Sequence, residues 1–163
     1  MIICGIDPGL TGAIARIDAA SGALVDVCDM PIFRLTKAGK NSKIVDAYLV
    51  TDLLGRGCGH VFVEVQQTRP GQAAQAVAKT FTGYGIILGV IVALGIPVTH
   101  VNSRAWKAAL RVPAAKDGAR ARASELICGG AAHWPLVKHD GRAEASLIAL
   151  WGIRTLTATA AVA

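Results

Sequence analysis

The sequence predicts a mixed α/β domain, in which helices flank a central five-stranded sheet of three antiparallel strands followed by two parallel ones. Three apolar runs separated by turn residues open the chain, and such a meander pairs antiparallel. Later apolar runs alternate with segments of helical periodicity, as in sheets whose strands are joined by helices. The predicted strands are residues 2–7, 12–18, 24–30, 60–65 and 98–101.

Residues 31–41 are polar and basic and are predicted to form a loop. Apolar spacing and capping residues then predict helices, the first of which is capped by Ser42. The predicted helices are residues 43–54, 72–81, an apolar helix from 82, a short helix from Ser103, one from Asp117, and 141–152. We therefore expect one domain over residues 1–154, followed by a flexible C-terminal tail at 155–163.

The amino-acid composition indicates which binding partners and which cellular compartment to expect. The formal net charge of +6 suggests an anionic partner such as nucleic acid. The four cysteines are scattered, so we expect reduced thiols in the cytoplasm and no zinc site. Residues 80–103 carry no formal charge and raise the question of a membrane span. Gly95-Ile96-Pro97 interrupts this stretch, so we expect a buried helix, a strand and no membrane association.

The first turn carries a carboxylate. Asp7 follows an apolar run, and Pro8-Gly9 supplies the dihedral angles of a turn before the next strand. A charge at the end of a buried strand is costly unless a metal ion or another partner compensates it. Asp7 is therefore either a cap on its own turn or a metal ligand, and this stretch alone leaves both open.

Three more carboxylates can join Asp7. Glu64 lies near the end of the fourth predicted strand, and Asp140 and Glu144 stand four apart, on one face of the last helix. If the first and fourth strands are neighbours, their carboxylates share one sheet edge. Carboxylates held together repel, and hard divalent cations such as Mg²⁺ relieve the repulsion. Two such ions can activate water and stabilise a leaving oxygen.

Each carboxylate also has an ordinary structural interpretation. Glu64 can form a buried ion pair with Arg69 or Arg142. Asp140 can cap the last helix, and Glu144 can be an exposed helix residue. All of these alternatives must hold together if there is no metal site, so the metal site is our preferred interpretation.

An ordered set of motifs carries a family resemblance. The segments are Gly5-Ile6-Asp7-Pro8-Gly9, Val63-Glu64, Phe81-Thr82-Gly83-Tyr84-Gly85, Val101-Asn102-Ser103-Arg104-Ala105-Trp106-Lys107, Lys116-x3-Arg120-x2-Ala123 and Asp140-Gly141-Arg142-Ala143-Glu144-Ala145. With them the chain resembles the RuvC-type Holliday-junction resolvases of the RNase H-like fold, especially their small phage-type members, over residues 2–152.

The resemblance implies a homodimeric endonuclease that resolves four-way DNA junctions and leaves 5′-phosphate and 3′-hydroxyl ends. It implies two Mg²⁺ ions, replaceable by Mn²⁺, held by Asp7, Glu64, Asp140 and Glu144. Lys116 is the implied catalytic cation at the scissile phosphate. A phage-encoded member would act in the host cytoplasm.

Two differences from bacterial members leave questions open. Their last two carboxylates commonly stand three apart, whereas here Ala143 occupies that position and Glu144 follows it. Either Asp140 or Glu144 can then be the direct ligand, with help from His139. The aromatic residue that usually follows the second acid is replaced by Gln66-Gln67-Thr68.

Basic residues provide the candidate DNA contacts, and phosphate contacts make affinity depend on salt. The candidates are Arg69, Lys79, Arg104, Lys107, Lys116 and Arg120. Trp106 is expected in the core. The alternative functions are a broader fork or flap debranching nuclease and a catalytically inactive nucleic-acid-binding protein of the same fold. An actin-like ATPase or sugar kinase shares the first loop but needs two such domains, and this chain is too short.

Overall fold

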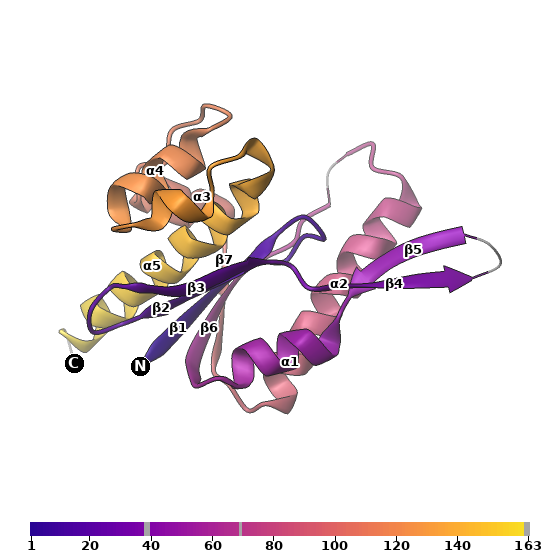
Figure 1. Ribbon diagram of the computed structural model, residues 1–163, viewed down its shortest axis with the longest axis horizontal. Coiled ribbons are helices and arrows are strands. Elements are labelled where there is room, and N and C mark those ends of the chain that lie inside the picture. Colours follow the sequence, from indigo (N-terminus) through magenta and orange to yellow (C-terminus); the bar gives the residue numbers. More distant parts are fainter. Residues whose placement is uncertain (38–39, 69, 162–163) are drawn as a thin grey trace.

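The central sheet has the predicted mixture of parallel and antiparallel strands. The computed structural model describes residues 1–37, 40–68 and 70–161. Five strands are ordered β3-β2-β1-β6-β7 (Figure 1). The antiparallel strands are β1 (Ile2–Asp7), β2 (Ala13–Asp18) and β3 (Leu24–Asp29). The strands parallel to β1 are β6 (Cys58–Glu64) and β7 (Val98–Val101), which confirms the predicted sheet.

Helices cover both faces of this sheet (Figure 1). One layer contains α1 (Ala47–Gly55) and α2 (Ala74–Ala93). The other contains α3 (Ser103–Ala109), α4 (Gly118–Leu126), α5 (Asp140–Ala160) and the short 3₁₀ helices η1 (Gly130–His133) and η2 (Val137–His139). Successive strand side chains point to opposite faces, so Val61 and Val63 join the α1–α2 core while Phe62 joins the α5 core.

Helix α5 packs closely on β1. A Cβ atom at Gly5 would overlap the carbonyl oxygen of Ala145 and the amide nitrogen of Ala149, so glycine is required where helix and strand meet. The helix continues to Ala160, so residues 155–160 of the predicted flexible tail are helical, because no glycine or proline follows Gly152.

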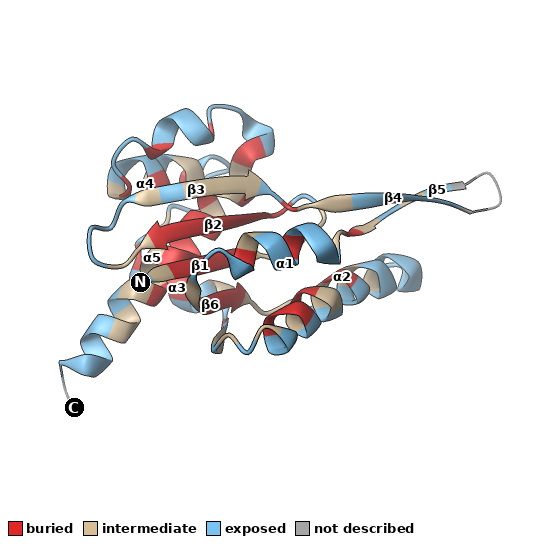
Figure 2. Ribbon diagram, turned by 60° about the horizontal axis from the view of Figure 1, so that its bottom comes forward, coloured by how far each residue is buried: buried red, intermediate tan, exposed pale blue. Residues whose placement is uncertain are grey.

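A β-hairpin replaces the loop that was predicted for residues 31–41. Strands β4 (Ile32–Lys37) and β5 (Lys40–Val45) form a separate two-stranded sheet that projects from the body (Figures 1 and 2). The prediction of a helix from Ser42 is also wrong, because β-branched Ile44 and Val45 pair with β4. Helix α1 begins later, where Asp46 Oδ1 accepts the amide hydrogen of Leu49 at 3.1 Å.

Helix α2 is one continuous helix rather than the two that were predicted. With 20 residues and a mean hydropathy of 1.7, the helix is long enough and apolar enough to cross a membrane, by length and composition alone. Ile87, Val90 and Ile91 pack into the α1–α2 core, yet only 28% of the residues in the most apolar window are buried. Figure 2 shows the exposed N-terminal half beside the hairpin. The helix therefore presents an apolar face that the described residues leave uncovered.

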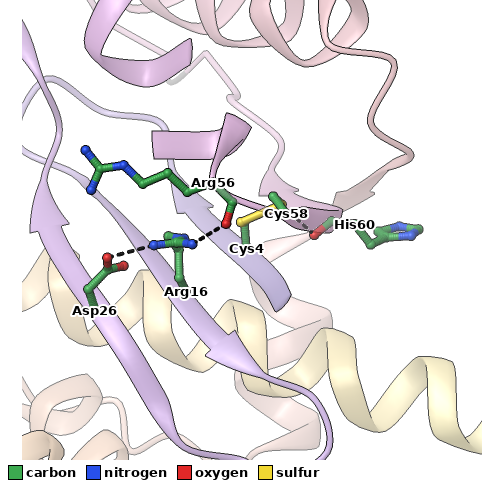
Figure 3. Close-up of a disulfide and its surroundings, with 6 residues drawn as sticks. All are labelled: Cys4, Arg16, Asp26, Arg56, Cys58 and His60. Carbon is green, nitrogen blue, oxygen red and sulfur yellow. Dashed lines mark hydrogen bonds and ion pairs between the residues drawn. A yellow bond between two sulfur atoms is a disulfide. The ribbon is translucent and has the colours of Figure 1, made fainter. Parts of the chain in front are cut away.

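Cys4 on β1 and Cys58 on β6 form a disulfide (Figure 3). Their Cα atoms are 6.2 Å apart, a separation that a disulfide spans. The prediction of reduced thiols is therefore wrong for this pair, because a register shift beside Ile2 brings the two strands' cysteines together. Beside the disulfide, Arg16 donates hydrogen bonds to Asp26 at 2.8 Å and to the carbonyl oxygen of Arg56 at 2.6 Å. Cys28 and Cys128 are free.

Candidate active site

Two predicted carboxylates lie at one edge of the sheet. Strands β1 and β6 are adjacent and parallel, and Ile6 is paired with Val63. Asp7 and Glu64, the next residues along the two strands, are therefore neighbours where both strands end. This is the arrangement that the sequence predicted for the case of adjacent strands.

The start of α5 brings a third carboxylate to this edge. At Gly141, a Cβ atom would lie 2.8 Å from the carbonyl oxygen of Thr11 and 2.9 Å from the Cα atom of Gly12. The absence of a side chain thus lets the helix start against the turn that follows Asp7. Glu144, one turn further along the helix, then interacts electrostatically with both strand carboxylates.

The three carboxylates behave as one electrostatic group. Burial, followed by the negative charges of Glu144 and Glu64, raises the pKa of Asp7 from 3.8 to about 7. The Gly9 amide, 3.4 Å from Asp7 Oδ1, and the Lys107 charge oppose this rise. Burial also raises the pKa of Glu64, and Glu144 adds to the effect. Negative charge is therefore concentrated here beyond what the surrounding hydrogen bonds compensate.

Helix α3 supplies the groups that partly compensate this charge. The Trp106 ring is buried in the core as predicted, and its indole Nε1–H donates to Glu64 Oε2 at 2.7 Å. Lys107 Nζ lies 2.7 Å from Glu144 Oε1 and 5.0 Å from the centre of the Trp106 ring. The sequence did not indicate the contact to Glu64, although a buried tryptophan usually finds an acceptor for its N–H.

Asp140 is held apart from this group. Its Oδ1 accepts a hydrogen bond from Arg120 Nε at 2.6 Å, whereas the carboxylates that chiefly raise the pKa of Asp7 are Glu144 and Glu64. The predicted quartet thus separates into three coupled carboxylates and one that is paired with arginine. His139 also points elsewhere, since its Nδ1 accepts the Leu136 amide hydrogen at 3.4 Å.

Arg142 does not pair with Glu64. It forms a two-pronged ion pair with Asp29, with N–O distances of 2.6 and 2.9 Å. The alternative of a buried Glu64–Arg142 ion pair is therefore wrong. The other proposed partner, Arg69, lies outside the described residues.

A cavity of about 550 Å³ opens beside Glu144. Its polar lining consists of Ser103, Arg104, Lys107, Lys116, Asp140 and Glu144. A smaller cavity of about 130 Å³, which Glu64 and Gln66 line, shares Ser103 with the first. Among the described residues, Arg104 and Lys116 form no ion pair, so both cations are available to an anion that enters.

The predicted DNA-binding residues lie at several different sites in the structure. Arg104, Lys107 and Lys116 line the larger cavity, while Arg120 is occupied by Asp140. Lys79 lies on α2, in a different groove beside the hairpin. The structure thus gathers three of the candidates around the coupled carboxylates.

The donor set suits a hard divalent cation. Three carboxylates provide oxygen ligands. Burial, and then the negative charges of Glu144 and Glu64, raise the pKa of Asp7, and a bound metal ion would oppose this rise. In this arrangement, no set of three or more His, Cys, Asp or Glu within the described ranges is grouped closely enough to hold an ion. Lys107 instead supplies a positive charge at Glu144. The residues therefore fit a metal by their chemistry, with Lys107 as the cation now in contact.

Comparison with solved structures identifies the fold. The chain is similar to Thermus thermophilus RuvC in complex with a Holliday junction substrate, with a TM-score of 0.68, 21% identity and coverage of 98% of this chain and 97% of that one. A second Thermus thermophilus RuvC structure gives a TM-score of 0.64, 22% identity and 98% coverage of both chains. No protein-family model and no curated protein matches the sequence.

The chain has the fold of RuvC. This likeness spans nearly the whole length of both proteins, and it confirms the RNase H-like architecture that the motifs implied. The resemblance to phage-type members stays a prediction.

We expect Asp7→Asn to stabilise the metal-free protein at high pH. The folded pKa of Asp7 lies above its unfolded value of 3.8, so ionisation costs stability as the pH rises from about 4 to about 7. Asparagine keeps the shape without the charge. The gain is at most about 4 kcal/mol above pH 7 and vanishes near pH 4. Thermal unfolding in EDTA across this pH range measures it.

Asp29→Asn is the control. Arg142 lowers the pKa of Asp29, so ionisation of this carboxylate stabilises the folded protein, whereas ionisation of Asp7 destabilises it. That variant should lose stability relative to the parent as the pH rises through the unfolded pKa. A difference between Asp7→Asn and the parent that stays constant from pH 4 to pH 8 would contradict the raised pKa of Asp7.

Proposed function

We propose that the protein is a metal-dependent, structure-selective DNA endonuclease that resolves four-way junctions. The observation that carries this proposal is the group of coupled carboxylates, Asp7, Glu64 and Glu144, at the sheet edge of a RuvC fold. The solved structure of Thermus thermophilus RuvC with a Holliday junction substrate supports DNA of this kind as the ligand. The net charge of +6 supports an anionic substrate independently.

The residues have separate roles in the proposed reaction. Asp7, Glu64 and Glu144 would hold Mg²⁺, or Mn²⁺ in its place, and Asp140 becomes available if Arg120 releases it. When bound, two such ions supply an activated water and stabilise the leaving oxygen, which yields 5′-phosphate and 3′-hydroxyl ends.

Three cations that line the larger cavity, together with the buried Trp106, prepare the site. Lys116 and Arg104 neutralise phosphate charge where they line the larger cavity. Trp106 fixes the orientation of Glu64 through its indole N–H. Lys107 must exchange its contact with Glu144 for a contact with DNA when a cation enters.

Asp7→Asn should abolish cleavage of a four-way junction in Mg²⁺ and leave binding in EDTA intact, because the carboxylate is needed for metal binding and not for phosphate contacts. A gel assay with labelled junctions measures cleavage, and fluorescence anisotropy measures binding. Asp52→Asn, on the exposed face of α1, is the matched control and should cut normally. Cleavage by Asp7→Asn at the parental rate would refute the assignment of Asp7 to the active site.

The same assay decides between the alternative substrates. A panel of junction, fork, flap and linear duplex should show preferential cleavage of the junction. Cleavage of forks and flaps as fast as the junction would indicate a general debranching nuclease and not a junction resolvase. Binding to branched DNA with no cleavage in either Mg²⁺ or Mn²⁺ would instead indicate an inactive DNA-binding protein.

We expect Lys107→Met to strengthen Mg²⁺ binding. The Lys107 ammonium contacts Glu144 at 2.7 Å and competes there with a cation. Because this ion pair is partly exposed, its loss should tighten the Kd for Mg²⁺ by about 2- to 5-fold. Isothermal titration calorimetry without DNA measures this constant. Lys116→Met is the control, since Lys116 lines the same cavity and forms no ion pair with any residue that the structure describes. Weaker Mg²⁺ binding by Lys107→Met alone would contradict the competition.

We further propose that two copies associate through α2. Its residues Phe81, Gly85, Gly89 and Val92 recur at helical spacing and are all exposed, Val92 by 73%. Cβ atoms at Gly85 and Gly89 would meet nothing within 4 Å, so a second chain can approach the helix closely there. A shared apolar face of this kind suits a homodimer.

Gly89→Glu should convert the dimer to a monomer without unfolding it. The open space around Gly89 accommodates a side chain in one chain, whereas a charge in the contact would be left unpaired. Sedimentation velocity measures the oligomeric state, and circular dichroism checks the fold. Gly55→Glu, at the exposed end of α1, is the control. A monomeric parent, or an unchanged dimer in Gly89→Glu, would contradict this interface.

A further inference from the structure

The β4–β5 hairpin leaves the sheet at the edge where the coupled carboxylates lie. Asp7 pairs with Ala13, and Ala13 pairs with Asp29 at the end of β3. The Met30 amide then donates to the Gly12 carbonyl at 2.8 Å, and β4 starts two residues later. Figures 1 and 2 show the hairpin extending outward from this edge. Residues 33–36 of β4 are exposed, whereas on β5 the exposed Asn41 and Lys43 alternate with less exposed residues. The hairpin is therefore an arm that begins next to the candidate active site.

The arm is basic and has no acidic residue to balance its charge. Residues 31–45 contain no Asp or Glu and four cations, which are Arg34, Lys37, Lys40 and Lys43. Arg34 and Lys43 are directly opposite each other across the two strands, and both are exposed. Like charges in this position destabilise a sheet. An anionic partner would turn this unfavourable pair into a binding site.

Cations elsewhere in the chain are often neutralised, in contrast to those of the hairpin. Arg56, Arg122 and Arg142 each contact a carboxylate. Within the described part of the chain, neither Arg34 nor Lys43 forms an ion pair. The difference shows that charge on the hairpin is left available for a partner.

Toward the tip of the hairpin, the side chains next to the Arg34–Lys43 pair are polar, whereas Ile32 and Val45 flank the pair toward the base. The next pair toward the tip on the same face is Thr36 and Asn41, whose side chains are hydrogen-bonded at 2.8 Å. The exposed Phe33 and Leu35 belong to the other face, because side chains alternate along a strand. A polar, cationic face suits a phosphate backbone better than the apolar core of a protein contact.

Helix α2 adds a cation beside the opposite face of the hairpin, because Leu35, Ser42 and Ile44 of the hairpin line the groove between the two elements. Lys79 and Lys43 line one groove of about 210 Å³ between the hairpin and the N-terminal half of the helix. Lys79 is exposed and, like Arg34 and Lys43, has no ion pair among the described residues. Hairpin and helix together thus place at least three free cations on the side of the molecule where the carboxylates lie.

We propose that the hairpin, with Lys79 at its base, is a second DNA-binding surface that follows the phosphate backbone of a duplex arm leaving the active site. This inference rests on the proposed function and adds a contact outside the catalytic cavity. A strand of six residues spans about 20 Å. At 3.4 Å per base pair, the surface covers about six base pairs.

Fluorescence anisotropy with a labelled four-way junction in EDTA, at several KCl concentrations, tests this inference. Arg34→Gln/Lys43→Gln should bind roughly 10- to 30-fold more weakly near 0.15 M salt, and the slope of log K against log salt should become shallower by about 2. The charge-preserving Arg34→Lys/Lys43→Arg should bind like the parent. Arg56→Gln/Arg154→Gln, which removes two cations near the opposite end of the sheet, should stay within about twofold of the parent.

Three results would overturn the inference. Unchanged affinity and salt slope in Arg34→Gln/Lys43→Gln, with normal junction binding by the parent, would reject the arm and leave the proposed function standing. No junction binding by the parent would reject both. A shift to monomer in this variant, seen by sedimentation velocity, would assign the hairpin to a second copy of the chain. Hydroxyl-radical footprinting supports the arm if the variant loses about six base pairs of protection at one end.

Discussion

The repulsion among Asp7, Glu64 and Glu144 is the constraint around which this structure is arranged. Separately, each carboxylate is an ordinary strand-end or helix residue. Packing of α5 on β1 at Gly5, and on the first turn at Gly141, forces Glu144 toward the strand carboxylates. The cost appears in the pKa of Asp7, which burial and its two neighbours raise to about 7. Such a cost is consistent with a site that is completed by a cation.

Helix α3 makes this arrangement tolerable in the isolated chain. Trp106 donates a hydrogen bond to Glu64, and the adjacent Lys107 forms an ion pair with Glu144. Two successive residues therefore stabilise two different carboxylates. Arg120 likewise donates a hydrogen bond to Asp140. Some of the cations that the sequence assigned to DNA are thus engaged with acids of the site. Substrate binding and metal binding would then involve an exchange of partners among the same side chains.

The sequence predicted the sheet well because its five strands are apolar runs bounded by turn residues. It missed the hairpin because the basic and polar residues of this stretch were interpreted as a loop, although Phe33 and Leu35 alternate with Arg34 and Thr36 as in a strand. The two strands also pair only with each other, outside the central sheet. It also missed the Cys4–Cys58 disulfide, which depends on the register between β1 and β6.

The acidic residues of the site were predictable as a set, but their grouping was not. The spacing of Asp140 and Glu144 cannot show that Arg120 reaches only one of them. Likewise, apolar periodicity placed Trp106 in the core without indicating where its N–H would point. Tertiary contacts between α3, α4 and α5 decide both questions.

Anomalous diffraction from crystals soaked in Mn²⁺ tests the central claim most directly. The account predicts an anomalous peak in contact with carboxylate oxygens of Asp7, Glu64 and Glu144, with Lys107 moved away from Glu144. No peak at this sheet edge under saturating Mn²⁺, with Lys107 still paired to Glu144, would contradict the account.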